Sequence, residues 1–243
     1  MTAVVVWTEV KLLTREPLTL LVSLLFPVVL MVLLVGSFGN DPDPEFGGVG
    51  GTDFYVPVYA AATIAVMGLL GIPTHLAAYR QTGVLRRLRA SGLSPLLVMA
   101  AQFVVMVALV AVGVAAMVGI GLAGYDLTPP ASVAGVLAGF VAGTVAFAAL
   151  GLLLGAFVPT ARAAQGLGLL LFFGLFFIAG GGPPPALLPD AVNRFVELTP
   201  MGPLVDAVSA PWHGHGVDGR AMVALAVIAV AAAALAERRL RRE

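Results

Sequence analysis

The chain has 243 residues, of which 60% are hydrophobic and 11% charged, and its 13 basic residues balance 13 acidic ones. Because soluble domains carry about 25% charged residues, a chain this apolar along its whole length excludes a soluble globular protein and a soluble enzyme with a single anchor. The absence of cysteine excludes disulfides, thiolate catalysis and cysteine-bound metals. The only lysine, Lys11, follows no glycine-rich turn, so the usual phosphate-binding loop is also excluded.

The N-terminal residues 4–16 predict an amphipathic helix in the membrane interface, and Pro17 marks a bend after it. Long uncharged runs then predict six membrane-spanning helices, since roughly 20 apolar residues cross a bilayer. The expected spans are approximately 18–39, 54–78, 96–124, 133–158, 164–182 and 217–236. The predicted fold class is therefore all-α, with one integral membrane domain over residues 1–243.

The charged residues between these spans predict the orientation. With the N-terminus in the cytoplasm, eleven of the 13 basic residues lie inside and nine of the 13 acidic residues lie outside. This positive-inside distribution predicts a multi-pass protein of the inner (plasma) membrane with both termini cytoplasmic. The uncharged run of the last span, 221–236, is short, and we expect the helix to begin near Val217 while Arg238 and Arg239 snorkel.

Catalytic and metal-binding patterns are weak, and we expect no enzyme activity, no catalytic residue and no metal. His75 is the only histidine, acidic or basic residue within the expected spans when the last is counted from its uncharged run, 221–236, and such a residue is more typical of a hydrogen-bonded interfacial position than of a ligand or proton relay. His213 and His215 form an H-x-H-x-x-D pattern with Asp218 on the outer side, and their role stays open. Without intramembrane acids, an ion-coupled transporter is disfavoured, and the energy for any transport must come from another chain.

The predicted cytoplasmic loop 79–95 contains a short helix on the membrane surface. Thr82 is a plausible N-cap, Leu85 and Leu88 share one face, and Gly92 is a helix stop. The same helix carries three closely spaced arginines, Arg86, Arg87 and Arg89. On charge alone, this segment is a basic anchor on anionic lipid.

The order of residues in the loop resembles the coupling-helix region of ABC-2-type permeases, the membrane subunits of ATP-binding-cassette (ABC) exporters. The matching residues are Arg80, Gly83, Leu85, Leu88, Arg89, Ser91, Leu93, Ser94 and Pro95. The family's usual acidic residue is replaced by Gln81, its threonine by Val84 and its proline by Gly92. The outer stretch 188–207 is also similar to the family pattern, in which two short helices re-enter the outer leaflet before the sixth span.

The resemblance implies a partner and a mechanism. A separate ABC ATPase, in two copies, would supply ATP and Mg²⁺, while this chain holds no cofactor and binds no nucleic acid. The permease would form a homodimer or a heterodimer within membrane lipid. The implied coupling residues are Arg80, Thr82, Gly83, Leu85, Arg86, Arg87, Leu88, Arg89 and Leu93, and the implied outer re-entrant region, 183–212, includes Glu197, Pro200 and Asp206.

The resemblance also implies that the second and fifth spans face the transport pathway. Candidate pathway residues are Tyr55, Tyr59, Phe172, Phe173, Phe176 and Phe177. By helical spacing, Phe173, Phe176 and Phe177 lie on one face, either as an apolar lining for cargo or as ordinary packing. The sequence 180–185, GGGPPP, then breaks the fifth span.

Small residues on the fourth span form a ridge at Gly135, Gly139, Gly143, Gly151 and Gly155, interrupted by Phe147. Such ridges permit close helix contact, and packing within one subunit is favoured over a dimer seam.

The leading functional hypothesis is an exporter permease for a hydrophobic or amphipathic cargo such as a drug, antibiotic or lipid, similar to the drug-resistance branch of the family. The alternatives are export of a polysaccharide or lipid-linked glycan, an ion-coupled secondary transporter, and a non-transporting membrane scaffold.

Overall fold

The computed structural model describes residues 25–84, 87 and 95–240, and within these ranges the chain is helical, with no strand. The predicted all-α fold class is confirmed. Five of the described helices are long and apolar enough to cross a membrane, and a shorter apolar helix precedes them. The predicted interfacial helix 4–16 and the beginning of the first expected span lie outside the described residues.

The helices follow the uncharged runs of the sequence. In chain order they are α3 (Phe26–Phe38), η2 (Pro44–Phe46), α4 (Gly51–Val66), η3 (Met67–Gly71), α5 (Ile72–Gln81), α7 (Pro95–Gly124), α8 (Val133–Phe157), α9 (Ala161–Phe176), η4 (Phe177–Gly181), η5 (Pro185–Leu187), α10 (Asp190–Leu198), α11 (Met201–Trp212) and α12 (Gly219–Leu240). The last helix has 22 residues, or about 33 Å at 1.5 Å per residue, which is enough to cross a bilayer.

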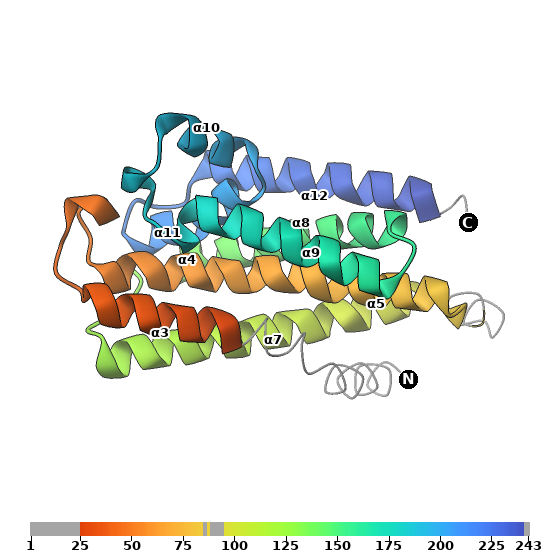
Figure 1. Ribbon diagram of the computed structural model, residues 1–243, viewed down its shortest axis with the longest axis horizontal. Helices are drawn as coiled ribbons and strands as arrows, with labels where there is room; N and C mark the ends of the chain where they lie inside the picture. Colours follow the sequence, from red (N-terminus) through yellow and green to blue (C-terminus); the bar gives the residue numbers. More distant parts are fainter. Residues whose placement is uncertain (1–24, 85–86, 88–94, 241–243) are drawn as a thin grey trace.

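The long helices lie side by side and give the molecule two distinct ends (Figure 1). One end, here called the α10 end, holds α10 and the beginnings of α4 and α12. The opposite end, here called the α5 end, holds the last turns of α5 and α12. The short helices α10 and α11 precede α12, where the sequence predicts two short helices before the last span.

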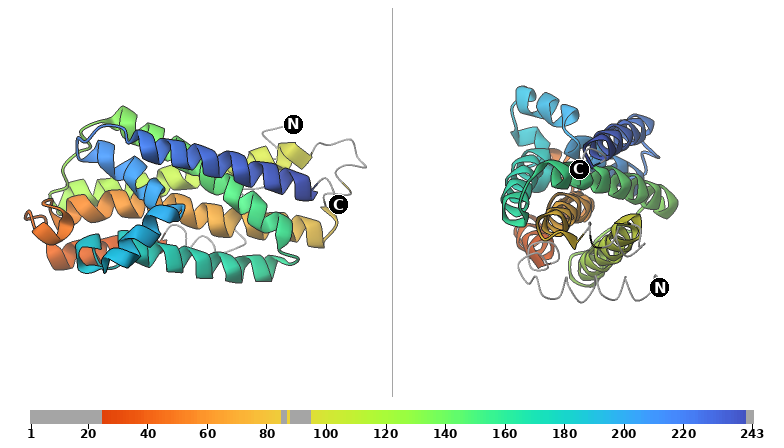
Figure 2. Two further views of the ribbon diagram at one scale, coloured as in Figure 1. Left: turned by 90° about the horizontal axis from the view of Figure 1, so that it is seen from above. Right: turned by 90° about the vertical axis from the view of Figure 1, so that its right-hand side faces the viewer.

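The continuous helix formed by α4, η3 and α5 is the centre of the bundle. Its most apolar 18-residue window is completely buried, and α3, α7, α8, α9 and α11 pack around it. The end-on view in Figure 2 shows this helix enclosed by its neighbours, whereas α12 lies on the far side of α8. The second expected span is therefore the core of a single chain.

A π-helical turn, η3, interrupts this central helix. Its characteristic bond joins the N–H of Ile72 to the carbonyl oxygen of Met67, five residues earlier. Pro73 follows at once, and a proline ring in an α-helix clashes with the carbonyl four residues before it, here that of Leu69. The wider turn relieves this clash. The carbonyl of Leu69 lies against Gly168 of α9, where an added Cβ would collide with it.

The glycine ridge of α8 packs against the same chain. A Cβ at Gly139 would collide with the carbonyl oxygen of Ala207 in α11, and one at Gly151 would collide with the carbonyl oxygen of Gly68 in η3. The ridge thus brings α8 into backbone contact with two neighbouring helices. In the structure, the ridge packs against helices of its own chain, as the sequence analysis favours.

Candidate functional site

The predicted coupling loop follows the last turn of α5 at the α5 end (Figure 1). The structure describes Arg80, Thr82, Gly83 and Arg87 from this set. The other predicted coupling residues lie outside the described residues, namely Leu85, Arg86, Leu88, Arg89 and Leu93.

Arg80 connects the end of α5 to the end of α8. Its Nη1 atom donates hydrogen bonds to the carbonyl oxygens of Gly155, at 2.7 Å, and Val158, at 3.1 Å. The last carbonyls of a helix have no partner within the helix, and a cation there also interacts favourably with the helix dipole. Arg80 therefore binds the C-terminus of α8 and also lies at the start of the predicted coupling loop.

Gln81 makes the corresponding contact with α9. Its Oε1 atom accepts a hydrogen bond of 3.3 Å from the backbone N–H of Ala161, the first residue of α9. The Thr160 hydroxyl caps the same helix by accepting from the N–H of Ala163 at 3.2 Å. An amide oxygen at position 81 provides the acceptor that a carboxylate would provide, which explains how this departure from the family pattern is accommodated.

Thr82 ends α5, and the helix that it is predicted to cap lies largely outside the described residues. Its hydroxyl donates back to the carbonyl oxygen of Ala78 at 2.8 Å, and its N–H donates to the same atom at 3.0 Å. Gly83 then takes a left-handed conformation, with φ +69°, as is common for the residue after a helix. The backbone N–H of Arg87 donates to the Gly83 carbonyl at 3.2 Å. Local sequence does not distinguish the two roles, because threonine hydroxyls serve at both kinds of helix end.

The candidate pathway aromatics form a buried cluster within the chain. The Tyr59 and Phe176 rings meet edge to face with centroids 5.1 Å apart, and the Phe176 and Phe172 rings stack at 5.3 Å. Tyr55 continues the cluster from Tyr59 at 6.0 Å. All four side chains are at most 1% exposed in the single chain. This cluster fastens α4 to α9.

The predicted common face of Phe173, Phe176 and Phe177 is wrong. Phe176 points inward to Tyr59, whereas Phe177 is 46% exposed and stacks on the partly buried Phe173, with centroids 6.2 Å apart. The inward pair is Phe172 and Phe176, four residues apart, and the outward pair is Phe173 and Phe177. Both pairings satisfy helical spacing, and the position of Tyr59 decides between them.

The two tyrosine hydroxyls bind the chain where the fifth span breaks. Helical geometry ends at Gly180, which has φ +91°, a value that favours glycine. The Tyr59 hydroxyl donates to the carbonyl oxygen of Gly181 at 2.7 Å, and the Tyr55 hydroxyl donates to that of Gly182 at 3.0 Å. These bonds satisfy carbonyls that the broken helix leaves without helical partners.

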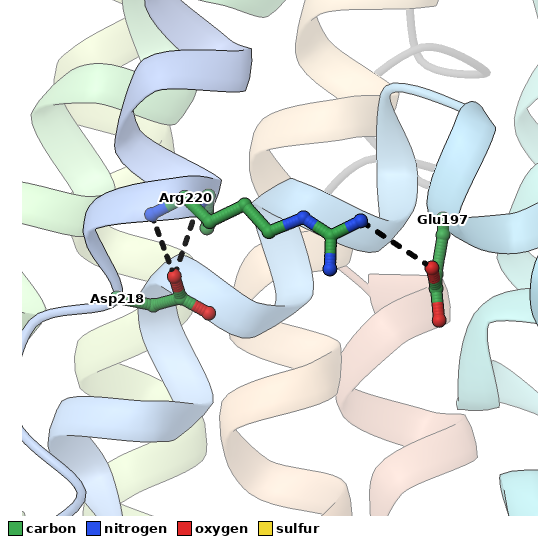
Figure 3. Close-up of polar contacts among 4 residues, drawn as sticks. Glu197, Asp218 and Arg220 are labelled. Carbon is green, nitrogen blue, oxygen red and sulfur yellow. Dashed lines mark hydrogen bonds and ion pairs between the residues drawn. The ribbon is translucent and has the colours of Figure 1, made fainter.

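The predicted outer residues lie on the two short helices at the α10 end. Pro200 precedes α11, and Glu197 lies in the last turn of α10. Figure 3 shows Arg220 reaching from the start of α12 toward Glu197, with 3.7 Å between Nη2 and Oε2. Asp218 caps α12 by accepting from the N–H groups of Arg220, at 2.8 Å, and Ala221, at 3.1 Å.

Asp206 lies on α11 near these charged groups. Although part of the residue is exposed, desolvation of its carboxyl raises the pKa to about 6, with further contributions from the negative charges of Asp218 and Glu197. The positive charge of Arg220 opposes this shift. The charge of Asp206 thus changes in a mildly acidic medium.

The histidines are held by ordinary contacts. His213 places Nε2 3.0 Å from the carbonyl oxygen of Asp53, and its ring centroid is 6.4 Å from that of His215. His75 is buried, with its ring 6.5 Å from that of Tyr79. Within the described ranges, no three histidine or acidic residues are grouped as metal ligands.

The comparison with protein families matches residues 2–211 to a model described as ABC-2 type transporter. The chain belongs to the ABC-2 type transporter family. No curated protein matches the chain. As an ABC-2 type transporter, it is a multi-pass membrane protein and an ABC transporter permease subunit, and members of this family in general work with a partner ATPase.

Two sets of contacts in this ABC-2 permease are not predicted from its sequence. The first is the bonding of Arg80 and Gln81 to the turn between α8 and α9, for which the only local signal is a basic and an amide residue at a helix end. The second is Trp212 at the end of α11, whose indole Nε1 donates to the carbonyl oxygen of Thr128 at 3.2 Å. Both contacts join segments about 80 residues apart, beyond any local pattern.

Proposed function

We propose that the chain is the permease subunit of an ABC exporter that moves a hydrophobic or amphipathic cargo, such as a drug, antibiotic or lipid, out of the cytoplasm or the inner leaflet. The observation that carries this proposal is the double connection at the α5 end. There the residues entering the coupling loop hold the C-terminus of α8 through Arg80 and the N-terminus of α9 through Gln81.

The distribution of charge supports a cytoplasmic α5 end. The last turns of α5 and α12 carry Arg80, Arg238 and Arg239. By contrast, acidic residues start α4 and α10, whose beginnings lie at the α10 end. A membrane protein oriented by the positive-inside rule would place the arginines in the cytoplasm, where an ATPase binds. Both chain termini would then be cytoplasmic.

The proposed coupling is a rigid-body movement. The loop would dock on a separate ATPase through Leu85, Leu88 and Leu93, and closure of two ATPase copies around ATP and Mg²⁺ would displace it. Because Arg80 and Gln81 bind two further helices, that displacement would move α5, α8 and α9 together. Hydrolysis would return the assembly to its first state.

The outward pair of phenylalanines suggests where a second permease and the cargo meet this chain. Phe173 and Phe177 lie on the outer face of α9 and η4, whereas Phe172, Phe176, Tyr55 and Tyr59 serve the core of one chain. In a homodimer or heterodimer joined near α9, Phe173 and Phe177 would line an apolar pathway. We propose efflux of an antibiotic-like compound, as in the drug-resistance branch of the family.

The decisive experiment is co-expression with a candidate ATPase that carries a phosphate-binding loop. We expect the two chains to co-purify and to export a hydrophobic fluorescent dye into inside-out vesicles when ATP is supplied. The double variant Leu85→Asp with Leu88→Asp should abolish ATPase binding. Arg80→Ala should keep the ATPase bound and reduce dye transport per ATP hydrolysed, because it releases α8 from the loop.

The matched control is Arg162→Ala, which removes an exposed arginine from the first turn of α9 at the same end. It should leave both binding and transport unchanged. Export by this chain alone, driven by an ion gradient without ATP, would instead assign a secondary transporter. A chain that binds no ATPase and transports nothing would be a scaffold.

A further inference from the structure

An almost wholly apolar groove of about 600 Å³ separates α7 from α8, with Thr144 as one polar residue in its lining. Its volume lies in the range of about 300–1,000 Å³ that small-molecule sites occupy. Among the described residues no charged side chain lines it, and its principal walls are Val107, Ala111 and Ala115 of α7 and Leu137 and Val141 of α8, with Trp212 at one end. Consecutive helices normally pack together, so a groove between these two requires a structural cause.

The cause is the way the connection 125–132 is fastened. The N–H of Ala131 donates to the carbonyl oxygen of Trp212 at 3.0 Å, and the indole of Trp212 donates to Thr128. These bonds hold the end of α11 beneath the connection. Below that point α7 packs mainly on α4, while α8 packs on α12 and α11 as well as on the continuous helix formed by α4, η3 and α5. These hydrogen bonds fix the end of the groove at which the connection lies.

The dimensions of the groove identify what fits in it. Its α7 wall extends from Phe103 to Val118, which is about 22 Å of helix. The whole empty space between the helices, about 1330 Å³ over that length, gives a mean cross-section of roughly 60 Å². A helix with side chains, about 10–12 Å wide, needs roughly 80–110 Å². A hydrocarbon chain, whose width follows from carbon contacts near 4 Å, needs only roughly 13–16 Å².

The position of Trp212 indicates which way such a chain points. Indole groups favour the membrane interface, where the ring is in an apolar medium and the N–H finds a polar partner. Trp212 closes the groove near the α10 end, and the walls run from there toward the α5 end, into the apolar part of the bundle. A polar head group would remain at the α10 end.

We propose that the groove between α7 and α8 binds one acyl chain of a membrane phospholipid, with the head group beside Trp212. An apolar groove facing a bilayer loses dispersion contacts unless hydrocarbon fills it, and phospholipid is the hydrocarbon at high concentration there. This inference does not depend on export or on an ATPase. The bound chain fills the space between two helices that the protein itself holds apart.

Fluorescence of Trp212 tests this proposal directly in the full chain. The sequence has two tryptophans, so Trp7→Phe leaves Trp212 as the single emitter. This variant is reconstituted into vesicles of phosphatidylcholine with brominated acyl chains, which quench indole on contact, or with ordinary chains. We expect a clear loss of emission in the brominated vesicles.

The groove-filling variant is Ala111→Phe with Ala115→Phe, in the same background. It should restore most of the lost emission, because two rings occupy the site of the chain. The matched control, Ala108→Phe with Ala116→Phe, makes the same change at positions of α7 that do not line the groove, and it should stay quenched. Val141→Phe fills the groove from α8, which keeps the test valid if the α7 variant does not fold.

Three results would overturn the proposal. The first is equal emission of Trp212 in brominated and ordinary vesicles. The second is equal quenching in the groove-filling and control variants. Because the chain has no cysteine, Val141→Cys also reports a second copy on this face, and efficient disulfide cross-linking between two chains would replace lipid with a protein partner.

Discussion

The hydroxyl of Tyr59 donates a hydrogen bond of 2.7 Å to the carbonyl oxygen of Gly181, and this bond joins α4 to the end of η4 across 122 residues. It lies where the fifth span stops being helical, so a side-chain hydroxyl supplies the hydrogen bond that the helical backbone no longer provides. The glycine- and proline-rich break after Gly180 is therefore held in place from the core.

Replacement of this hydroxyl should destabilise the fold. Tyr59→Phe leaves a buried carbonyl without its donor, and we expect the free energy of unfolding to fall by about 1–3 kcal/mol. Tyr55→Phe is the matched comparison, because its bond to Gly182 is only partly buried and its loss should cost less. Denaturant unfolding in a mild detergent measures both. A larger effect from Tyr55→Phe would contradict the assigned role of Tyr59.

Position 81 should accept a carboxylate side chain in place of Gln81 but not a hydrocarbon side chain. Gln81→Glu keeps an acceptor for the N–H of Ala161 and adds negative charge at the start of α9, where the helix dipole favours it by about 0.3–1 kcal/mol. Gln81→Leu has no acceptor. We expect the first variant to match or exceed the wild type in thermal stability and ATP-driven transport, and the second to fall below it in both. Equal behaviour of the two variants would show that the hydrogen bond is unimportant.

Gly139 should not accept even one methyl group. A Cβ there meets the backbone of Ala207, which cannot move without shifting α11, so Gly139→Ala should cost about 1–3 kcal/mol in overpacking. Gly166→Ala in α9 is the control, because a Cβ there meets no atom within 4 Å. That change should be neutral or slightly stabilising, as alanine favours helix. We therefore expect the unfolding midpoint to fall clearly in Gly139→Ala and to stay the same or rise slightly in Gly166→Ala.

Asp206 should make stability depend on pH in an unusual direction. Its pKa is raised from 3.8 to about 6 in the folded chain, so the folded state binds the proton more tightly than the unfolded state. The contribution of this group is most favourable below the unfolded pKa and is lost as the pH rises through the folded pKa. Asp206→Asn should thus unfold at a higher temperature than the wild type above about pH 7 and equally near about pH 4.

The control for this effect is Asp41→Asn, which removes an exposed carboxylate near the same end of the bundle. Its unfolding temperature at the two pH values measures the effect of removing an exposed carboxylate. If Asp206→Asn lowers the unfolding temperature at neutral pH, the negative charge of Asp206 stabilises the fold and the expected direction of the pH dependence is wrong.

Helix positions are accessible to sequence reasoning because their signals are local. The uncharged run over 133–158 predicts a helix, and α8 occupies Val133–Phe157 with Ser132 capping it through the N–H of Gly135. The all-helical class and the family follow from such runs and from the residues around Gly83. These features need only neighbours along the chain.

The direction of individual side chains is not accessible in the same way. Phe173 and Phe176 are three residues apart, a spacing that many pairs of buried helix residues share. Of these two phenylalanines, Phe176 is the one whose ring contacts Tyr59. The family resemblance assigns Arg80 to the coupling of an ATPase, and the structure adds the carbonyls of Gly155 and Val158 as its partners within the chain. Such contacts depend on which helices become neighbours, and periodicity within one helix does not contain that information.

The π-helical turn at Met67–Gly71 sets the direction of everything beyond it. One residue more than an α-helical turn rotates the following helix by about 100° about its axis, since each residue of an α-helix turns by that angle. Arg80 lies seven residues beyond Pro73, about 10 Å along the helix, and faces the end of α8. The length of the π-helical turn therefore sets the side of α5 on which this arginine lies.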